Sequence, residues 1–392
     1  MEDPHGWKWF LCDGHAGRYL SHHPSRFSSR YKRPNRGGGF SNRGEELEID
    51  PLVATYVPPS ERYRRMRRSP VDGKQRGISL EAATHPVTEA TFQPLLESNV
   101  TWIVQTPFGW QSRYNSPRIR LSPNAGWWGE SDMGIAETTQ MAREFGIHTL
   151  LKPHVWLSDR SDGKWRAQIE MDSEADWQQW FAEYRSFMLH YARLAEENDI
   201  EALCIGTELH RAAVVRPADW RELIAAVRQE YSGELTYAAN WYSEYQEISF
   251  WDALDYIGIQ AYFPLTEQVA PSVEELKRGW GPHLAAIEAV QRAQQKPVLF
   301  TEVGYHSTVD GAIRPWEWDS EDAEGTQELG LQTQANCYEA LFQIFWSREW
   351  FAGAYFWKWH ADDDAAGGPN YATEFTPQNK PAEQVMAKWY AR

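Results

Sequence analysis

Eight short apolar runs alternate with longer amphipathic segments, and this pattern constrains the fold more than any other feature of the chain. The runs are residues 77–81, 101–106, 148–154, 202–208, 235–240, 256–262, 298–302 and 353–359. Apolar residues recur at three- and four-residue steps, as in helices, within residues 173–197, 217–231, 272–294 and 332–346. Strands that alternate with helices favour a parallel sheet, and eight of them close a barrel. The sequence therefore predicts an α/β fold, a (β/α)8 TIM barrel.

The rival architecture is an open doubly wound sheet, which usually carries a glycine-rich phosphate turn after its first strand. No such turn follows residues 77–81. A barrel takes about 250 to 300 of the 392 residues, which leaves room for an extension. Residues 1–72 are rich in Ser, Arg, Gly and His and predict a poorly ordered basic N-terminal extension. We therefore expect two parts, the extension at 1–72 and the barrel domain at 73–392.

Two glutamates end two of the predicted strands, Glu208 after residues 202–207 and Glu302 after residues 298–301. A carboxylate at the tip of a buried strand costs desolvation free energy unless it is paired or used in chemistry. Either one alone is more typical of a salt bridge or a helix cap. Active residues of barrel enzymes gather where the carboxyl ends of several strands meet. There, two carboxyl groups can serve as acid and nucleophile on a glycosidic bond, so the pair favours sugar-bond hydrolysis.

Other polar and aromatic side chains are expected at the same end of the barrel. Because side chains alternate along a strand, Val298 and Phe300 share the inward direction of Glu302. Tyr262 is either a rim aromatic or a hydrogen-bond donor that holds Glu302 ionised. His154 suits hydroxyl recognition beside Lys152, or else is an ordinary buried histidine. The candidate substrate-binding residues are Trp110, Lys152, His154, Asn240, Tyr262 and Trp357.

Net charge and composition limit the chemical class of the binding partner. The formal net charge is −16, and because residues 1–70 hold 13 Lys+Arg and 8 Asp+Glu, the remainder carries −21. So acidic a surface repels nucleic-acid phosphates and anionic membranes and favours a neutral ligand. The 21 tryptophans suit both core packing and stacking on sugar rings. We expect a neutral oligo- or polysaccharide partner, with no nucleic acid and no membrane.

Cysteine and histidine spacing gives no sign of a bound metal or cofactor. The three cysteines are too few for a disulfide framework or a zinc pattern, and most of the twelve histidines lie outside metal-like spacings. We expect no cofactor and no metal. There is no run of about 18 apolar residues, and the first residues lack the basic-then-apolar order of a signal peptide. On these grounds a cytoplasmic location is expected.

Short motifs at the predicted strand ends resemble the clan of retaining (β/α)8 glycoside hydrolases, and most closely glycoside hydrolase family 113, which contains β-mannanases. The resemblance covers about residues 74–392 and is carried by residues 105–110, 152–156, 205–209, 239–241, 260–265, 300–305 and 357–359. It implies that Glu208 is the acid/base and Glu302 the nucleophile. Many members of the clan place Asn before the acid/base to bind the sugar 2-hydroxyl. Here Thr207 stands in that position, so Asn240 or His154 are the candidates for that contact.

The sequence thus predicts a retaining hydrolase that cleaves β-1,4-linked mannan or manno-oligosaccharides by double displacement. Retention requires the two carboxyl groups to lie about 5 to 5.5 Å apart. Two alternatives stay open. One is an exo-acting β-glycosidase on another neutral β-glycan, and the other is a catalytically silent carbohydrate-binding barrel.

Overall fold

The computed structural model describes residues 72–121, 126–317, 329–361 and 371–392. The expected N-terminal extension therefore lies, but for residue 72, outside the described residues.

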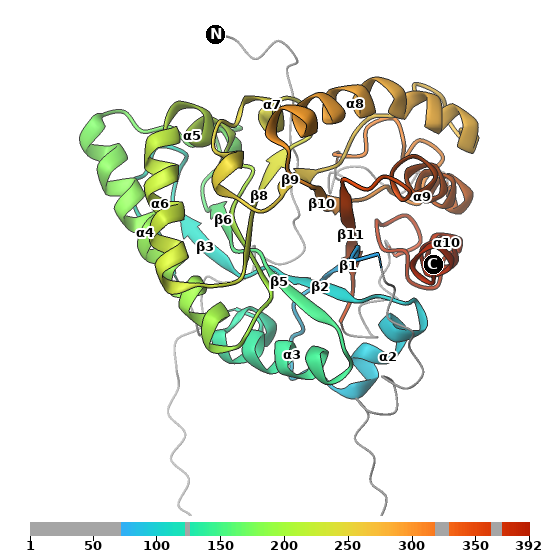
Figure 1. The fold of residues 1–392 in the computed structure, drawn as a ribbon, viewed down its shortest axis with the longest axis horizontal. Coiled ribbons are helices and arrows are strands. Elements are labelled where there is room, and N and C mark those ends of the chain that lie inside the picture. The colour runs from blue at the N-terminus through green and yellow to red at the C-terminus, as the bar shows by residue number, and fades with distance from the viewer. Residues whose placement is uncertain (1–71, 122–125, 318–328, 362–370) are drawn as a thin grey trace, which may run out of the picture.

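Eight parallel strands close into a barrel in the order β1-β11-β10-β9-β8-β7-β5-β2 (Figure 1). Each of the eight apolar runs supplies one strand of the barrel, which confirms the fold expected from the sequence. The strands are β1 (Gln75–Leu80), β2 (Trp102–Gln105), β5 (His148–Leu151), β7 (Ala202–Thr207), β8 (Glu234–Asn240), β9 (Ile257–Gln260), β10 (Val298–Val303) and β11 (Phe351–Trp359).

Helices surround the barrel in Figure 1, and several begin at capping residues. Ser173 and Ser272 accept hydrogen bonds from backbone N–H groups three residues later, at 3.2 and 3.3 Å, as N-caps do. The helices are α2 (Glu89–Glu97), α3 (Asp132–Glu144), α4 (Glu174–Glu197), α5 (His210–Val215), α6 (Pro217–Glu230), α7 (Glu244–Glu247), α8 (Val273–Gln294), α9 (Leu331–Phe345) and α10 (Pro381–Tyr390), with short 3₁₀ turns at Trp128–Glu130, Arg166–Gln168 and Trp251–Ala253.

The apolar core has two layers, as the barrel fold requires. The larger layer packs strand residues against the helices. The smaller one takes alternate residues from six barrel strands: Val104, Leu150, Ala202, Cys204, Ala238, Leu299 and Tyr355.

Strand β10 departs from simple alternation. Phe300 contacts the helix residues Trp280 and Phe345 with ring centroids 6.0 and 4.9 Å away, so it faces the helices, and Val298 belongs to the same outer layer. The expectation that Val298 and Phe300 point inward was therefore wrong. The pairing of β10 with β9 shifts register between Phe300 and Glu302. Such an irregularity changes which side chains point inward, because it breaks the two-residue period.

The third predicted strand, 148–154, is in fact two strands. β5 ends at Leu151, and after Lys152-Pro153 the chain enters β6 (His154–Leu157), part of a separate sheet of order β4-β3-β6. That sheet also contains β3 (Phe108–Gln111) and β4 (Ile119–Leu121). Pro153 has no backbone N–H to continue a ladder, which explains the break. The prediction that His154 and Lys152 lie on one barrel strand was therefore wrong, because His154 begins β6.

Candidate active site

Glu302 lies in β10 and is buried, and both of its carboxylate oxygens have partners. The Lys152 ammonium donates to Oε1 and, at 3.2 Å, to the Thr301 carbonyl. The Tyr262 hydroxyl donates to Oε2 at 2.8 Å, which confirms the predicted bond. Donors on both oxygens fix the orientation of a carboxylate. Lys152, expected to contact sugar hydroxyls, is thus engaged with Glu302.

Glu208 directly follows β7 and has a φ of 56°. Its backbone N–H donates to the Ala238 carbonyl of β8 at 2.8 Å, and this bond holds the turn against the barrel rim. Burial raises the pKa of the Glu208 carboxyl, the positive charge of Arg166 opposes the rise, and the negative charge of Glu302 adds to it, so the net pKa is raised. The two glutamates therefore interact electrostatically, and each also has one cation beside it, Arg166 at Glu208 and Lys152 at Glu302.

Arg166 is a site residue that the sequence analysis missed. Its Nε and Nη2 donate to Oε2 of Glu208 at 3.0 and 2.6 Å. The guanidinium carbon lies 5.3 Å from the ring centre of Trp156 and 5.9 Å from that of Trp165, within cation–π range. Arg166 belongs to a short 3₁₀ turn in the long connection between β6 and α4. No sequence period fixes where such a residue points, so only the folded connection brings it to Glu208.

His154 and Asn240 are buried and each keeps one polar atom without a hydrogen-bond partner among the described residues: Nε2 of His154 and Oδ1 of Asn240. Burial, together with the positive charges of Arg166 and Lys152, holds the pKa of His154 well below its usual range, so the ring is neutral. A buried polar atom left unpaired costs free energy. Both atoms are therefore suited to hydrogen-bond a bound hydroxyl group.

The two tryptophans singled out from the sequence lie near these charged groups. Trp357, in β11, has its ring centre 5.9 Å from the Lys152 ammonium. Trp110, in β3, pairs in register with Trp156 of β6, whose ring contacts Arg166. Trp110 and Trp357 are both only partly buried, which leaves ring surface available for contact.

An ion network that the sequence analysis did not anticipate joins the ends of β1 and β11. Lys358 Nζ lies 2.6 Å from Glu81 and 3.3 Å from Glu374, while His360 contacts the same two carboxylates at 2.5 and 3.0 Å. Burial lowers the pKa of His360, but the bonds to both carboxylates outweigh it and raise the pKa to about 9. Burial raises the pKa of Glu81, but the His360 bond and the Lys358 charge outweigh it and lower the pKa to about 2.

We expect this network to stabilise the fold over a defined pH window. Because the folded pKa of His360 is raised from 6.5, its contribution is fully present below about pH 6.5 and is lost as the pH rises through about 9. His360→Gln should therefore lower the free energy of unfolding by on the order of 2 kcal/mol at pH 6, and by much less at pH 10. Urea unfolding at both pH values measures this. His210→Gln, which alters a histidine paired with Glu247, is the control; an equal deficit at both pH values in His360→Gln would contradict the window.

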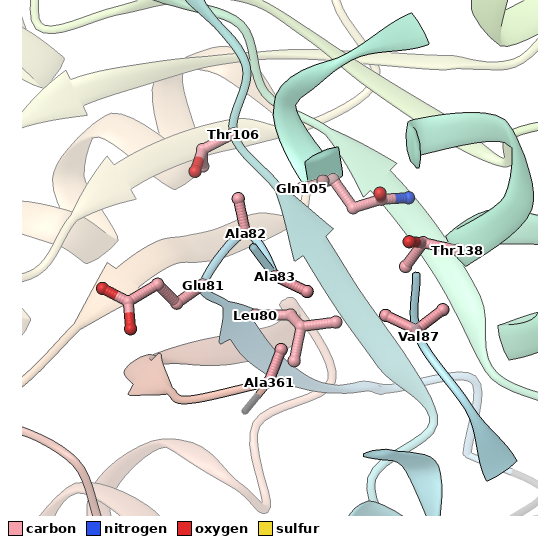
Figure 2. A pocket seen from close by; sticks show the side chains of 10 residues that line it. Leu80, Glu81, Ala82, Ala83, Val87, Gln105, Thr106, Thr138 and Ala361 are labelled. Carbon is pink, nitrogen blue, oxygen red and sulfur yellow. The ribbon is translucent and has the colours of Figure 1, made fainter. Parts of the chain in front are cut away.

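A small pocket that is partly open to solvent lies beside this network at the ends of β1 and β2 (Figure 2). The Glu81 side chain points away from its apolar wall in that view. The lining residues are Leu80, Glu81, Ala82, Ala83, Val87, Gln105, Thr106, Gly129, Thr138 and Ala361. Neither Glu208 nor Glu302 is among them, so the pocket is not the place where the two carboxyl groups meet.

Within the described ranges, no group of three or more His, Cys, Asp or Glu side chains is arranged to hold a metal ion. None of the helices in that part of the chain is both long enough and apolar enough to cross a membrane.

A closed parallel barrel with two buried carboxyl groups, one after the fourth barrel strand and one in the seventh, is the architecture of barrel glycoside hydrolases. The model of Glycoside Hydrolase Family 113 matches residues 81–380. The chain belongs to this family and is a glycoside hydrolase.

Solved structures agree with that assignment. The chain is similar to the family 113 β-mannanase of Alicyclobacillus acidocaldarius solved in complex with ManMIm, with 29% identity, a TM-score of 0.68, and coverage of 81% of this chain and 97% of that one. It is also similar to a family 113 β-1,4-mannanase solved as a complex, with 26% identity, a TM-score of 0.66, and coverage of 81% and 98%. A Ruminococcus gnavus β-glucuronidase, at 14% identity and a TM-score of 0.53, shares the fold alone, and this chain spans about half of its length. No curated protein sequence matches the chain.

Proposed function

We propose that this glycoside hydrolase cleaves β-1,4-linked mannan or manno-oligosaccharides with retention of anomeric configuration. The observation that carries the proposal is the contrast between the two glutamates. Both have a cation beside them, but Glu302 has donors on both carboxylate oxygens, whereas the pKa of Glu208 is raised because burial and the charge of Glu302 outweigh Arg166. One is thereby suited to act as nucleophile and the other as acid. The substrate follows from the family 113 mannanases that the chain resembles.

In the first step, a Glu302 oxygen forms a bond to the anomeric carbon while the bond from that carbon to the glycosidic oxygen breaks. The proton of Glu208 goes to the departing oxygen, and a covalent glycosyl-enzyme ester results. In the second step, Glu208, now ionised, takes a proton from water, whose oxygen attacks the anomeric carbon and releases Glu302. A carboxyl separation of about 5 to 5.5 Å, which this path demands, stays a prediction.

The neighbouring residues take supporting roles in this proposal. Lys152 and Tyr262 hold the Glu302 carboxylate in a fixed orientation for attack. His154 and Asn240 offer buried polar atoms for sugar hydroxyls, including the axial 2-hydroxyl of mannose. Trp110 and Trp357 are candidate platforms for sugar rings.

Product analysis tests the function. The full chain is incubated separately with β-1,4-mannan, manno-oligosaccharides, β-glucan and xylan, and the products are separated by chromatography. We expect a series of manno-oligosaccharides, and NMR of the first product should show the β anomer. Release of mannose alone would identify the exo-acting alternative, and release from glucan or xylan only would overturn the substrate. An initial α anomer would contradict retention, and binding without release would identify a carbohydrate-binding barrel.

The bond from Arg166 to Glu208 gives a prediction about pH. The charged groups around Glu208 are Arg166, Lys152 and Glu302, with Glu244 interacting from α7. Because Arg166 lowers the pKa of Glu208, Arg166→Met should raise it further and move the alkaline limb of the kcat/KM profile to higher pH. Arg160→Met is the matched control, since Arg160 also lies over the Trp156 ring, at 5.2 Å. A limb that stays in place or moves to lower pH contradicts this role for Arg166.

A further inference from the structure

Glu244 is a fully buried carboxyl group that the proposed mechanism does not use. It opens α7, four residues beyond the end of β8. Three donors converge on it: the Tyr237 hydroxyl reaches Oε1 at 2.5 Å, and the Asn240 backbone N–H and side-chain Nδ2 both reach Oε2 at 2.7 Å. Two of its three bonds therefore go to one residue of the candidate active site.

The direction of the two bonds from Asn240 does not depend on the protonation of Glu244. Burial raises the pKa of its carboxyl group to about 8, although the three donors oppose the rise. When the group is ionised, both oxygens accept hydrogen bonds. When it is neutral with its proton on Oε1, that O–H donates to the Tyr237 oxygen, and Oε2 is still an acceptor. Oε2 therefore faces the Nδ2 end of the Asn240 amide in both states.

This contact determines which end of the Asn240 amide faces away from Glu244. With Nδ2 bound to Glu244, the carbonyl Oδ1 is directed elsewhere, and it is buried with no hydrogen-bond partner in the described part of the chain. Asn240 is the last residue of β8, whose neighbours β7 and β9 lead to Glu208 and Tyr262. Asn240 Oδ1 is therefore a buried acceptor that can receive a hydrogen bond from a ligand.

One neighbour competes for that acceptor. Gln260 of β9 pairs in register with Asn240, and its Nε2 also has no partner among the described residues. Its Oε1 accepts from Thr301 at 3.0 Å, which holds that end of the Gln260 amide toward β10. A bond from Gln260 to Asn240 would use this acceptor and leave none for a sugar hydroxyl.

The geometry points to Glu244 as a positioning residue that presents Asn240 Oδ1 as an acceptor to one sugar hydroxyl. The site would then select for a substrate that carries a hydrogen-bond donor at that position. This inference rests on the proposed function only in that the site binds a glycoside.

The experiment compares substrates in which one hydroxyl at a time is replaced by fluorine, which cannot donate a hydrogen bond. For each position, the ratio of kcat/KM between parent and analogue is measured in the wild type and in variants. Fluorine also withdraws electrons, but this effect acts on every protein alike and cancels when the ratios are compared. We expect the wild-type ratio at one position to exceed that of Asn240→Ala and Glu244→Met about tenfold.

Three further results separate positioning from a structural role. Glu244→Gln keeps an acceptor oxygen, so its ratio of kcat/KM between parent and analogue should be close to that of the wild type. Glu247→Met, the same change three residues later on α7 at a partly exposed site, should leave the ratio unchanged. A merely structural role would lower activity on the parent and all analogues equally. If Glu244→Met does not fold, Glu244→Asp, which draws the carboxylate back from Asn240 by one methylene, takes its place in the comparison.

The inference is overturned if no position shows a ratio that differs between the wild type and Asn240→Ala, as a bond from Gln260 to Asn240 would give. It is also overturned if Glu247→Met changes the ratio as much as Glu244→Met. If the chain hydrolyses a β-glycoside other than mannan, the proposed substrate fails while this test proceeds on that glycoside. If the chain hydrolyses no β-glycoside, the ratio between parent and analogue is taken from the dissociation constants of the two ligands.

Discussion

Glu302→Ala should lower kcat on mannan by on the order of 10⁴- to 10⁶-fold, the range found when an enzymatic nucleophile unit is removed. The reason is that the first step of double displacement has no other group to bond the anomeric carbon. Binding of manno-oligosaccharides should persist, because a carboxylate paired with Lys152 and Tyr262 contributes to the transition state rather than to ring stacking. Turnover by stopped assay and binding by calorimetry measure the two effects separately.

Added azide gives Glu302→Ala a diagnostic product. Azide can enter the space left by the carboxylate and displace an activated leaving group in a single inversion, so a β-glycoside should yield an α-glycosyl azide. Glu230→Ala, a change at an exposed glutamate paired with Arg193, is the control and should keep wild-type turnover. Substantial hydrolysis of mannan by Glu302→Ala would remove Glu302 from the role of nucleophile.

Glu208→Ala should slow hydrolysis of mannan by about 10²- to 10⁴-fold, the usual contribution of a general acid or base. The loss should depend on the leaving group. The dinitrophenolate leaving group of a dinitrophenyl glycoside departs without a proton, so formation of the glycosyl-enzyme should be nearly unaffected. Hydrolysis of the glycosyl-enzyme should be slow because it lacks its base. A burst of dinitrophenol followed by slow turnover should therefore appear in stopped-flow absorbance.

Azide again distinguishes the role of Glu208. In Glu208→Ala it should attack the glycosyl-enzyme formed by Glu302, and a second inversion gives a β-glycosyl azide. The alkaline limb of the pH profile should also disappear, because it reports the proton of Glu208. Equal losses on good and poor leaving groups would indicate that Glu208 does not protonate the leaving oxygen.

The barrel and four of its helices were predictable because their signals are local. Short apolar runs marked all eight barrel strands, and the four helices expected from three- and four-residue steps begin and end within one or two residues of α4, α6, α8 and α9. The predicted bond from Tyr262 to Glu302 is also present, since both residues follow from strand position and neighbouring strands.

The failures came where the local period is interrupted. The register shift between Phe300 and Glu302 turned Phe300 toward the helices, and Pro153 ended β5 and placed His154 in a second sheet. A period-two count continues through both points because it contains no information about pairing with the next strand.

The sequence alone determined the closed eight-stranded barrel, the two glutamates at strand ends and the family. Periodicity and motifs are properties of neighbouring residues, so they can be read without the fold. Only the tertiary structure decided the charged partners of those glutamates. Lys152 meets Glu302 across 150 positions of the chain and Arg166 meets Glu208 across 42, while Glu81 and His360 meet across 279. Such contacts depend on closure of the barrel and on the paths of its long connections, which set the distances between charges that no local pattern encodes.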